Sequence, residues 1–90
     1  MSRKKYYDLE KVLKGASNHR RIEVLFLLYS SHDIATEEII GKLRINYQTG
    51  TMHLQKLVRA GLVDAHRQGS TLIHNISKLG KSIIYLLKNI

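Results

Sequence analysis

Apolar residues recur at helical spacing in five segments of the chain, and two short strand-like segments lie between the fourth and the fifth. The first helix is predicted over residues 6–14, with Gly15 as its stop. The second begins at Ser17 or Asn18, both good N-caps, and continues through HRRIEVLFLLYSS. Its apolar residues form a wide stripe, so we expect this helix at the centre of the core. The stripe consists of Ile22, Leu25, Phe26 and Tyr29, widened by Val24, Leu27 and Leu28.

Two further helices and a hairpin follow a turn at residues 30–33 and a short strand at residues 34–35. Thr36 is expected to cap the third helix, whose inner side carries Ile39, Ile40 and Leu43, and Asn46 to cap the fourth. The fourth helix has Leu54, Leu57 and Val58 on its apolar side and stops at Gly61. Strands are predicted at residues 62–67 and 71–76, joined by a turn over residues 68–70.

The fifth helix, capped by Ser77, is more apolar than a short terminal helix on a small domain needs to be. Its apolar positions occupy more than one stripe, and an apolar excess at a chain end suggests a partner surface. The apolar residues of this helix are Leu79, Ile83, Ile84, Leu86, Leu87 and Ile90.

The side of the fourth helix opposite its apolar stripe carries amide, hydroxyl and basic side chains. Amides can pair with base edges, and Lys and Arg can bind phosphates, which predicts contact with duplex DNA. The expected base contacts are Gln48, Thr49, Met52 and Gln55. The expected phosphate contacts are Thr51, Lys56 and Arg59, and Tyr47 is placed to touch backbone or a base. The hairpin tip adds Arg67, Gln68 and Ser70, which would reach the adjacent minor groove or its backbone.

The formal net charge of +8 is unevenly distributed. Residues 1–40 hold seven basic and six acidic residues, whereas residues 41–90 hold eight basic residues and a single acid, Asp64. The half with the polar-faced helix and the hairpin therefore carries +7 of the total, and such a field attracts polyanions.

Composition and motifs exclude several other classes. Ninety residues that are 43% hydrophobic and 24% charged indicate one globular domain, and the lack of cysteine excludes disulfides and thiolate metal sites. No apolar run could span a bilayer, and the first residues lack the apolar core of a signal peptide, which fits an intracellular location. His66 and His74 could face each other across the hairpin, but two histidines without a third ligand make a weak site, so we expect no metal and no cofactor. No catalytic constellation is present, and we expect a non-enzyme.

Several motifs together resemble the arsenical-repressor-like (ArsR-type) winged-helix transcription regulators. The matching segments are NHRRIEVLFLL, with Arg21 in the place of that family's usual arginine, EEIIGKLRINYQTGTMHLQKLVRAGLV, and the wing RQGSTLIHNIS, with His74 replacing a usual tyrosine. The resemblance runs from about Asn18 to the end. The metal-binding cysteines of the family are absent.

Three positions depart from that pattern. Ile40 stands where the family usually has alanine, and Gly50 where it has valine or isoleucine. These positions pack against each other in the family, so the exchange resembles volume compensation. Arg44 occupies a turn position that is often glycine, so either this residue carries strain or the turn differs from that of the family.

The resemblance implies a mainly α fold with a small β-hairpin, a winged helix-turn-helix over residues 1–90, with helices 6–14 and 78–89 as dimerisation elements. These two helices lie side by side in the family, so the apolar excess of the last helix predicts a homodimer interface formed by Tyr6, Leu9, Leu13, Ile83, Leu86, Leu87 and Ile90. The resemblance also implies a homodimeric transcription regulator that acts as a repressor on double-stranded DNA with an inverted-repeat operator. The expected location is the cytoplasm of a prokaryotic cell, with the protein encoded by that cell or by a virus or plasmid of it. The alternative is a winged helix that serves as a protein-interaction module within a larger complex. Such modules often lose the basic face that this chain keeps.

Overall fold

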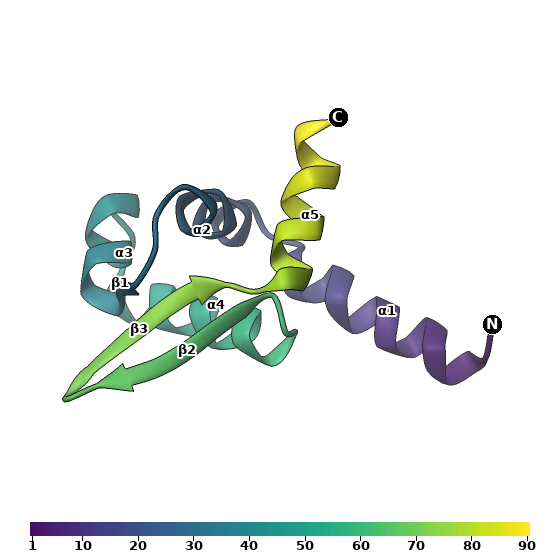
Figure 1. Ribbon diagram of the computed structural model, residues 1–90, viewed down its shortest axis with the longest axis horizontal. Helices are drawn as coiled ribbons and strands as arrows, with labels where there is room; N and C mark the ends of the chain where they lie inside the picture. The colour runs from purple at the N-terminus through teal and green to yellow at the C-terminus, as the bar shows by residue number, and fades with distance from the viewer.

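The computed structural model describes all 90 residues as five helices and a three-stranded antiparallel sheet (Figure 1). The elements in chain order are α1 (Arg3–Ala16), α2 (His19–Ser30), β1 (Ile34–Ala35), α3 (Thr36–Leu43), α4 (Tyr47–Arg59), β2 (Val63–Gln68), β3 (Thr71–Ile76) and α5 (Lys78–Lys88). This confirms the predicted winged helix-turn-helix and its element order. No helix has both the length and the apolar character that a membrane crossing requires.

Three of the predicted N-caps are confirmed. The side chains of Asn18, Asn46 and Ser77 each accept a hydrogen bond from a backbone N–H of the first turn that follows. The prediction for Thr36 was wrong, because Thr36 is the first helical residue and the cap position belongs to Ala35, which has no side-chain acceptor. At this end the chain passes directly from β1 into α3, so the sheet rather than a cap sets the helix start.

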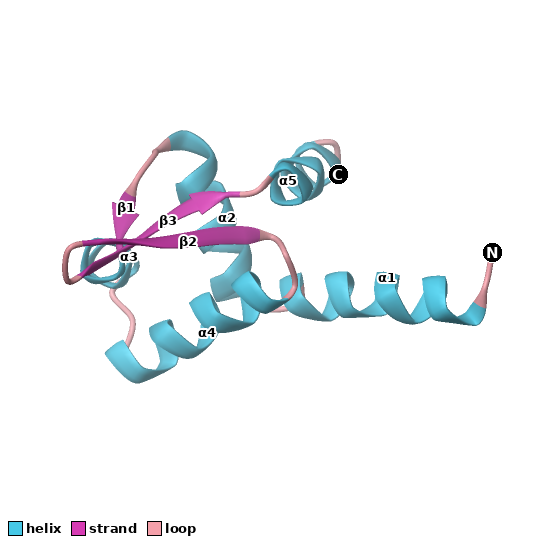
Figure 2. Ribbon diagram, turned by 60° about the horizontal axis from the view of Figure 1, so that its bottom comes forward, coloured by secondary structure: helices cyan, strands magenta, loops and turns pink.

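Helix α1 is longer at both ends than predicted. It begins at Arg3, where Ser2 is the N-cap, and it continues through Gly15 to Ala16. Gly15 is not a stop signal. It lies in the helix where a side chain would collide with Ala60, just after α4, so glycine allows the two helices to meet closely. Figures 1 and 2 show that the rest of α1 reaches away from the domain.

The sheet has the order β1-β3-β2, and β2 and β3 form the wing. Val63 pairs with Ile76 at its base and Gln68 with Thr71 at its tip, which leaves a two-residue turn of Gly69 and Ser70. Gly69 has a φ of +62°, the left-handed conformation that short hairpin turns require. Strand β2 begins one residue later and ends one residue later than predicted.

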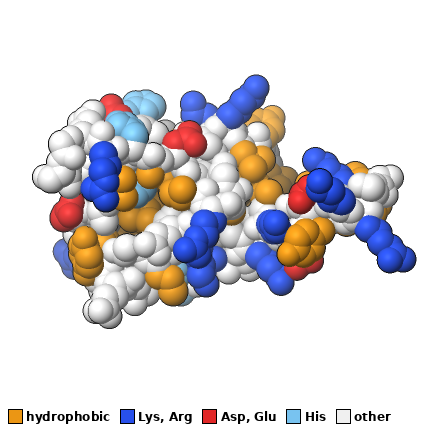
Figure 3. All heavy atoms as spheres, turned by 90° about the horizontal axis from the view of Figure 1, so that it is seen from below, with side chains coloured by type: hydrophobic (Ala, Val, Ile, Leu, Met, Phe, Trp, Pro, Cys, Tyr) orange, Lys and Arg blue, Asp and Glu red, His pale blue; other side chains and the backbone are white.

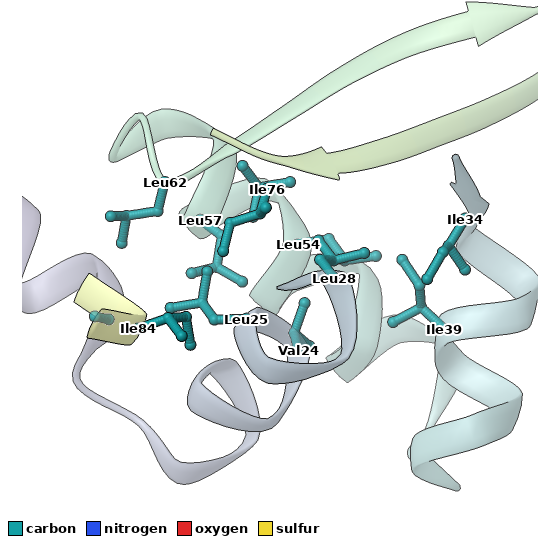
Figure 4. Packing of buried hydrophobic residues seen from close by; sticks show 12 residues of the cluster. Val24, Leu25, Leu28, Ile34, Ile39, Leu54, Leu57, Leu62, Ile76 and Ile84 are labelled. Atoms are coloured by element: carbon teal, nitrogen blue, oxygen red, sulfur yellow. The ribbon is translucent and has the colours of Figure 1, made fainter. Parts of the chain in front are cut away.

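The core lies between α2, α4, the base of the hairpin and α5 (Figure 4). Its fully buried side chains include Val24, Leu25, Leu28, Leu57 and Ile84. The buried face of α2 therefore consists of Val24, Leu25 and Leu28, together with Arg21. The predicted stripe was only partly right, since Phe26 and Tyr29 lie at the exposed flank of the helix.

The compensating pair predicted in the helix-turn-helix is present. A side chain added at Gly50 would meet Ile40 Cγ1 at 2.8 Å and Ile45 Cδ1 at 3.0 Å, both tighter than normal contacts. Arg44 adopts a φ of +53° and ψ of +48° in the turn between α3 and α4. Of the two alternatives, the structure supports strain, because Arg44 is a non-glycine residue in the left-handed conformation.

Candidate nucleic-acid interface

Helix α4 presents a polar outer face along its whole length. Gln48, Met52, Gln55 and Arg59 follow helical spacing on one side and are exposed. Lys56, Thr49 and Tyr47 flank them and are also exposed. The Asn46 side chain accepts hydrogen bonds from the N–H groups of Gln48 (2.9 Å) and Thr49 (3.2 Å), which fixes the start of this face. The structure thus brings seven of the eight predicted contact residues of α4 onto one surface.

Thr51 is the exception among the predicted phosphate contacts. Its hydroxyl oxygen is buried and has no hydrogen-bond partner, and it lines a cavity between α4 and the hairpin. The prediction of Thr51 as a phosphate contact requires an exposed hydroxyl group, which the structure does not show. Its position on the flank next to the wing turns it away from the outer face.

A buried arginine connects the inner side of α4 to the helices behind it. Arg21 Nε donates to His53 Nδ1 (3.1 Å), and Arg21 Nη1 donates to the carbonyl oxygens of Lys14 and Gly15 (3.2 Å each). Burial, and then the charge of Arg21, lower the pKa of His53 below its ordinary value of 6.5. Neutral His53 keeps the lone pair that accepts from Arg21. This connection of α1, α2 and α4 through Arg21 was not predicted from the sequence.

The hairpin tip carries Arg67, Gln68 and Ser70, all exposed as expected. The predicted histidine pair does not form. His74 pairs with Ala65, and His66 pairs with Ile73, so the two imidazoles lie on opposite faces of the hairpin. His66 is exposed and His74 is buried.

Basic side chains extend the polar face of α4 toward α1. A cleft of about 300 Å³ at the junction of α1, α2 and α4 has no acidic residue in its lining. It is lined by Lys11, Lys14, Gly15, Arg21, Lys56, Arg59 and Ala60. Figure 3 shows Lys and Arg side chains distributed along this side of the molecule from the hairpin to α1. Sequence reasoning missed Lys11 and Lys14, because only the tertiary contact of Gly15 with Ala60 brings them beside α4.

The ends of the chain carry a different kind of surface. On α1, Tyr6, Leu9 and Leu13 are exposed. The exposed fraction is 57% for Leu86 on α5 and 95% for Ile90, which follows that helix. Ile83 and Leu87 are half-buried. The exposed apolar surface also includes Tyr7, Phe26, Tyr29 and Tyr85, which were not among the predicted interface residues. The Lys88 ammonium lies 4.8 Å from the centre of the Tyr29 ring, which places the end of α5 beside the outer flank of α2.

Comparison with known proteins finds regulators of transcription. The transcriptional activator HlyU of Vibrio cholerae is 29% identical over 77 residues, which are 84% of this chain and 70% of HlyU. A solved structure of V. cholerae HlyU matches with a TM-score of 0.84 and 26% identity, over 98% of this chain and 96% of that one. No protein-family model matches the chain.

Two further solved structures extend this comparison. The homodimeric winged helix-turn-helix DNA-binding domain Mb0332 of Mycobacterium bovis, a possible ArsR-family transcriptional regulator, matches with a TM-score of 0.81 and 28% identity, over 99% of this chain and 84% of that one. The transcriptional repressor PagR of Bacillus anthracis matches with a TM-score of 0.82 and 25% identity, over 96% of this chain and 99% of that one. The resemblance is confirmed, and the chain has the winged helix-turn-helix fold of the ArsR-like transcription regulators.

Proposed function

We propose that this protein is a transcription regulator that binds double-stranded DNA sequence-specifically as a homodimer. The observation that carries the proposal is the outer face of α4, where exposed amide and basic side chains continue into a cleft without acids. Amides read base edges and basic residues hold phosphates, so one surface supplies both requirements of a sequence-specific interface. Relatives of similar fold are transcription regulators, which supports the same conclusion.

In the proposed complex α4 lies in the major groove. Gln48, Thr49, Met52 and Gln55 contact bases, and Lys56 and Arg59 hold phosphates. Tyr47, at the start of the helix, touches backbone or a base. Lys11 and Lys14 extend the phosphate contacts beyond the end of α4. The wing tip, with Arg67, Gln68 and Ser70, reaches the adjacent minor groove or its backbone.

The homodimer is proposed to form through α1 and α5, with Tyr6, Leu9 and Leu13 against Ile83, Leu86, Leu87 and Ile90 of a second copy. Their exposed apolar surface is unfavourable in water at about 25 cal/mol per Å². Mb0332, which has a similar fold, is homodimeric. A two-fold dimer would present two α4 helices about 34 Å apart, so we propose an inverted-repeat operator with half-sites about one helical turn apart.

The proposed direction of regulation is repression. A dimer bound across an inverted repeat occupies both strands and blocks other proteins from the same site. Among the relatives, HlyU is an activator and PagR a repressor, so reporter-gene expression with and without the protein decides the direction. A protein-interaction module is the second candidate, but the basic outer face of α4 favours DNA.

The test is selection from a random duplex library followed by a salt titration. We expect an inverted repeat, with log K falling against log salt at a slope of about −5 if about six phosphates are neutralised per dimer. Affinity that stays constant between low and moderate salt, or a selection without enrichment, would contradict DNA binding and favour the protein-interaction module.

A further inference from the structure

A cavity of about 270 Å³ lies between α4 and the hairpin, next to the face proposed for DNA. Its lining comes from α3, α4, β2 and β3, and consists of Thr36, Thr51, Leu54, Gln55, Val58, Arg59, Ala65, Leu72 and His74. Figure 3, which views the molecule from this side, shows hydrophobic side chains gathered beside the hairpin. Drug-sized ligands occupy pockets of about 300 to 1,000 Å³, so this cavity is sized for a molecule with a single ring.

Two buried polar atoms without a hydrogen-bond partner belong to residues that line this cavity. They are Thr51 Oγ1 and His74 Nδ1, the only such side-chain atoms in the protein. His74 is 1% exposed, and buried polar groups normally have partners. Both residues line the same cavity, which indicates that a polar group from outside the chain can satisfy the two unpartnered atoms there.

The chemistry of that group follows from the state of His74. Burial lowers the pKa of His74, although a hydrogen bond to the backbone of Ile34 and the charge of Glu37 oppose the effect. The imidazole is therefore neutral near pH 7, and its bond to the backbone leaves Nδ1 as an acceptor. Thr51 can donate or accept. A hydroxyl group satisfies both atoms, since it donates to His74 Nδ1 and accepts from the Thr51 hydroxyl.

The remaining walls define the rest of the molecule. Leu54, Val58, Ala65 and Leu72 offer an apolar lining that suits an aromatic ring. Arg59 contributes an exposed guanidinium group that forms no ion pair within the protein. Arginine binds carboxylates through two parallel hydrogen bonds.

We propose that this cavity is a binding site for a small hydroxyaromatic carboxylate. The hydroxyl group lies against His74 and Thr51, the ring lies between the apolar side chains of α4 and the hairpin, and the carboxylate pairs with Arg59. The regulatory consequence rests on the proposed function. Gln55 and Arg59 line the cavity and also belong to the face proposed for DNA, so a ligand that pairs with Arg59 competes with DNA for this side chain and weakens DNA binding.

The first experiment uses the full chain without DNA and the probe 4-hydroxybenzoate, followed by NMR of the methyl groups. We expect saturable shifts at Leu54, Val58, Ala65 and Leu72. Benzoate, which lacks the hydroxyl group, should bind at least tenfold more weakly, and so should phenol, which lacks the carboxylate. Shifts that do not saturate up to 10 mM, or equal affinity for all three probes, would overturn the site.

Substitutions that should leave the fold intact test the proposed contacts of the site. Thr51→Val keeps the shape of the side chain and removes the hydroxyl group, and Arg59→Gln removes the charge at an exposed position. Each should weaken the probe at least fivefold, whereas Lys81→Gln, which removes an exposed charge on α5, should not. Equal binding by all three variants would overturn the proposed contacts.

A second titration repeats the DNA assay with saturating 4-hydroxybenzoate. We expect a loss of DNA affinity of at least threefold, which Thr51→Val abolishes. Unchanged DNA affinity with bound probe would overturn the coupling. Probe binding by a chain that binds no DNA would uphold the site and overturn the proposed function, so the two failures are distinguishable.

Discussion

Helices α4 and α5 differ in what they expose. Each buries part of its surface in the core, with Leu54 and Leu57 on α4 and Ile84 on α5. The outer face of α4 is polar and basic, whereas that of α5 exposes Tyr85 and Leu86. Burial in the shared core explains the inner faces of both helices and predicts nothing about their outer faces. The outer faces therefore separate a surface suited to DNA from a surface suited to a second copy.

The largest effect, on dimerisation and on operator affinity, is expected when the exposed apolar surface of α5 is given a charge. Leu86→Glu places a charge on an exposed apolar position without touching the core. We expect a monomer of 10.4 kDa in sedimentation and, since avidity is lost, operator affinity about 100-fold lower. Ser82→Glu adds the same charge to a polar exposed position of the same helix and should leave the dimer intact. A wild-type protein that sediments as a monomer at micromolar concentration would disprove the α1–α5 interface.

A large effect is also expected on the inner face of α4. Gly50→Val overpacks the contact with Ile40 and should reduce the free energy of unfolding by about 1 to 3 kcal/mol in urea denaturation. Adding Ile40→Ala should recover much of the loss, because contacting residues are not additive. Gly41→Ala, in open space on α3, should not destabilise the protein. Simple additivity of the two changes would show that the contact carries no energy.

Two neighbours on the outer face of α4 should separate base reading from phosphate binding. Gln55→Ala should cost about 1 to 3 kcal/mol on the preferred operator and less on other sequences. Lys56→Ala should weaken all sequences alike and flatten the salt slope by about one unit. Equal losses on every sequence for Gln55→Ala would remove it from the base-reading residues.

The smallest effect is expected from the two buried histidines, His53 on α4 and His74 on β3. His53 and His74 both have a lowered pKa, so between that pKa and the ordinary value of 6.5 the unfolded chain binds more protons than the folded one. Stability from this source is fully present above pH 6.5 and declines as the pH falls below it. Urea midpoints between pH 7.5 and 5 should show this decline, and His53→Gln should reduce it. A constant midpoint in both proteins would contradict the lowered pKa values.

The sequence predicted much of the fold because periodicity, caps and turn residues act locally. Asn18, Asn46 and Ser77 mark helix starts through contacts within three residues, and Gly69 marks the hairpin turn. The wrong ends of α1 have a tertiary cause. Gly15 resembles a helix stop, but in the structure it permits the close approach of Ala60.

The candidate site was predictable only on the exposed face of α4. A helical wheel separates Gln48 and Gln55 from Leu54, but it cannot decide positions at its flanks, which depend on the neighbouring element. Thr51 therefore appeared among the phosphate contacts although its hydroxyl group is buried. The hydrogen bond of Arg21 to His53 spans 32 residues of sequence, so no local pattern indicated it.

The junction of α1 with α4 has a geometric consequence for the spacing of the two DNA-reading helices. Helix α1 has 14 residues, which at about 1.5 Å per residue make a lever of about 21 Å. A rotation of about 5° at its base moves its tip by about 2 Å over that length. One base pair advances about 3.4 Å along the duplex, so small rotations in both copies shift the half-sites by a base pair. Gly15 and Arg21 form the contacts that join this end of α1 to α4 and α2, so in the proposed dimer they would determine the distance between the half-sites.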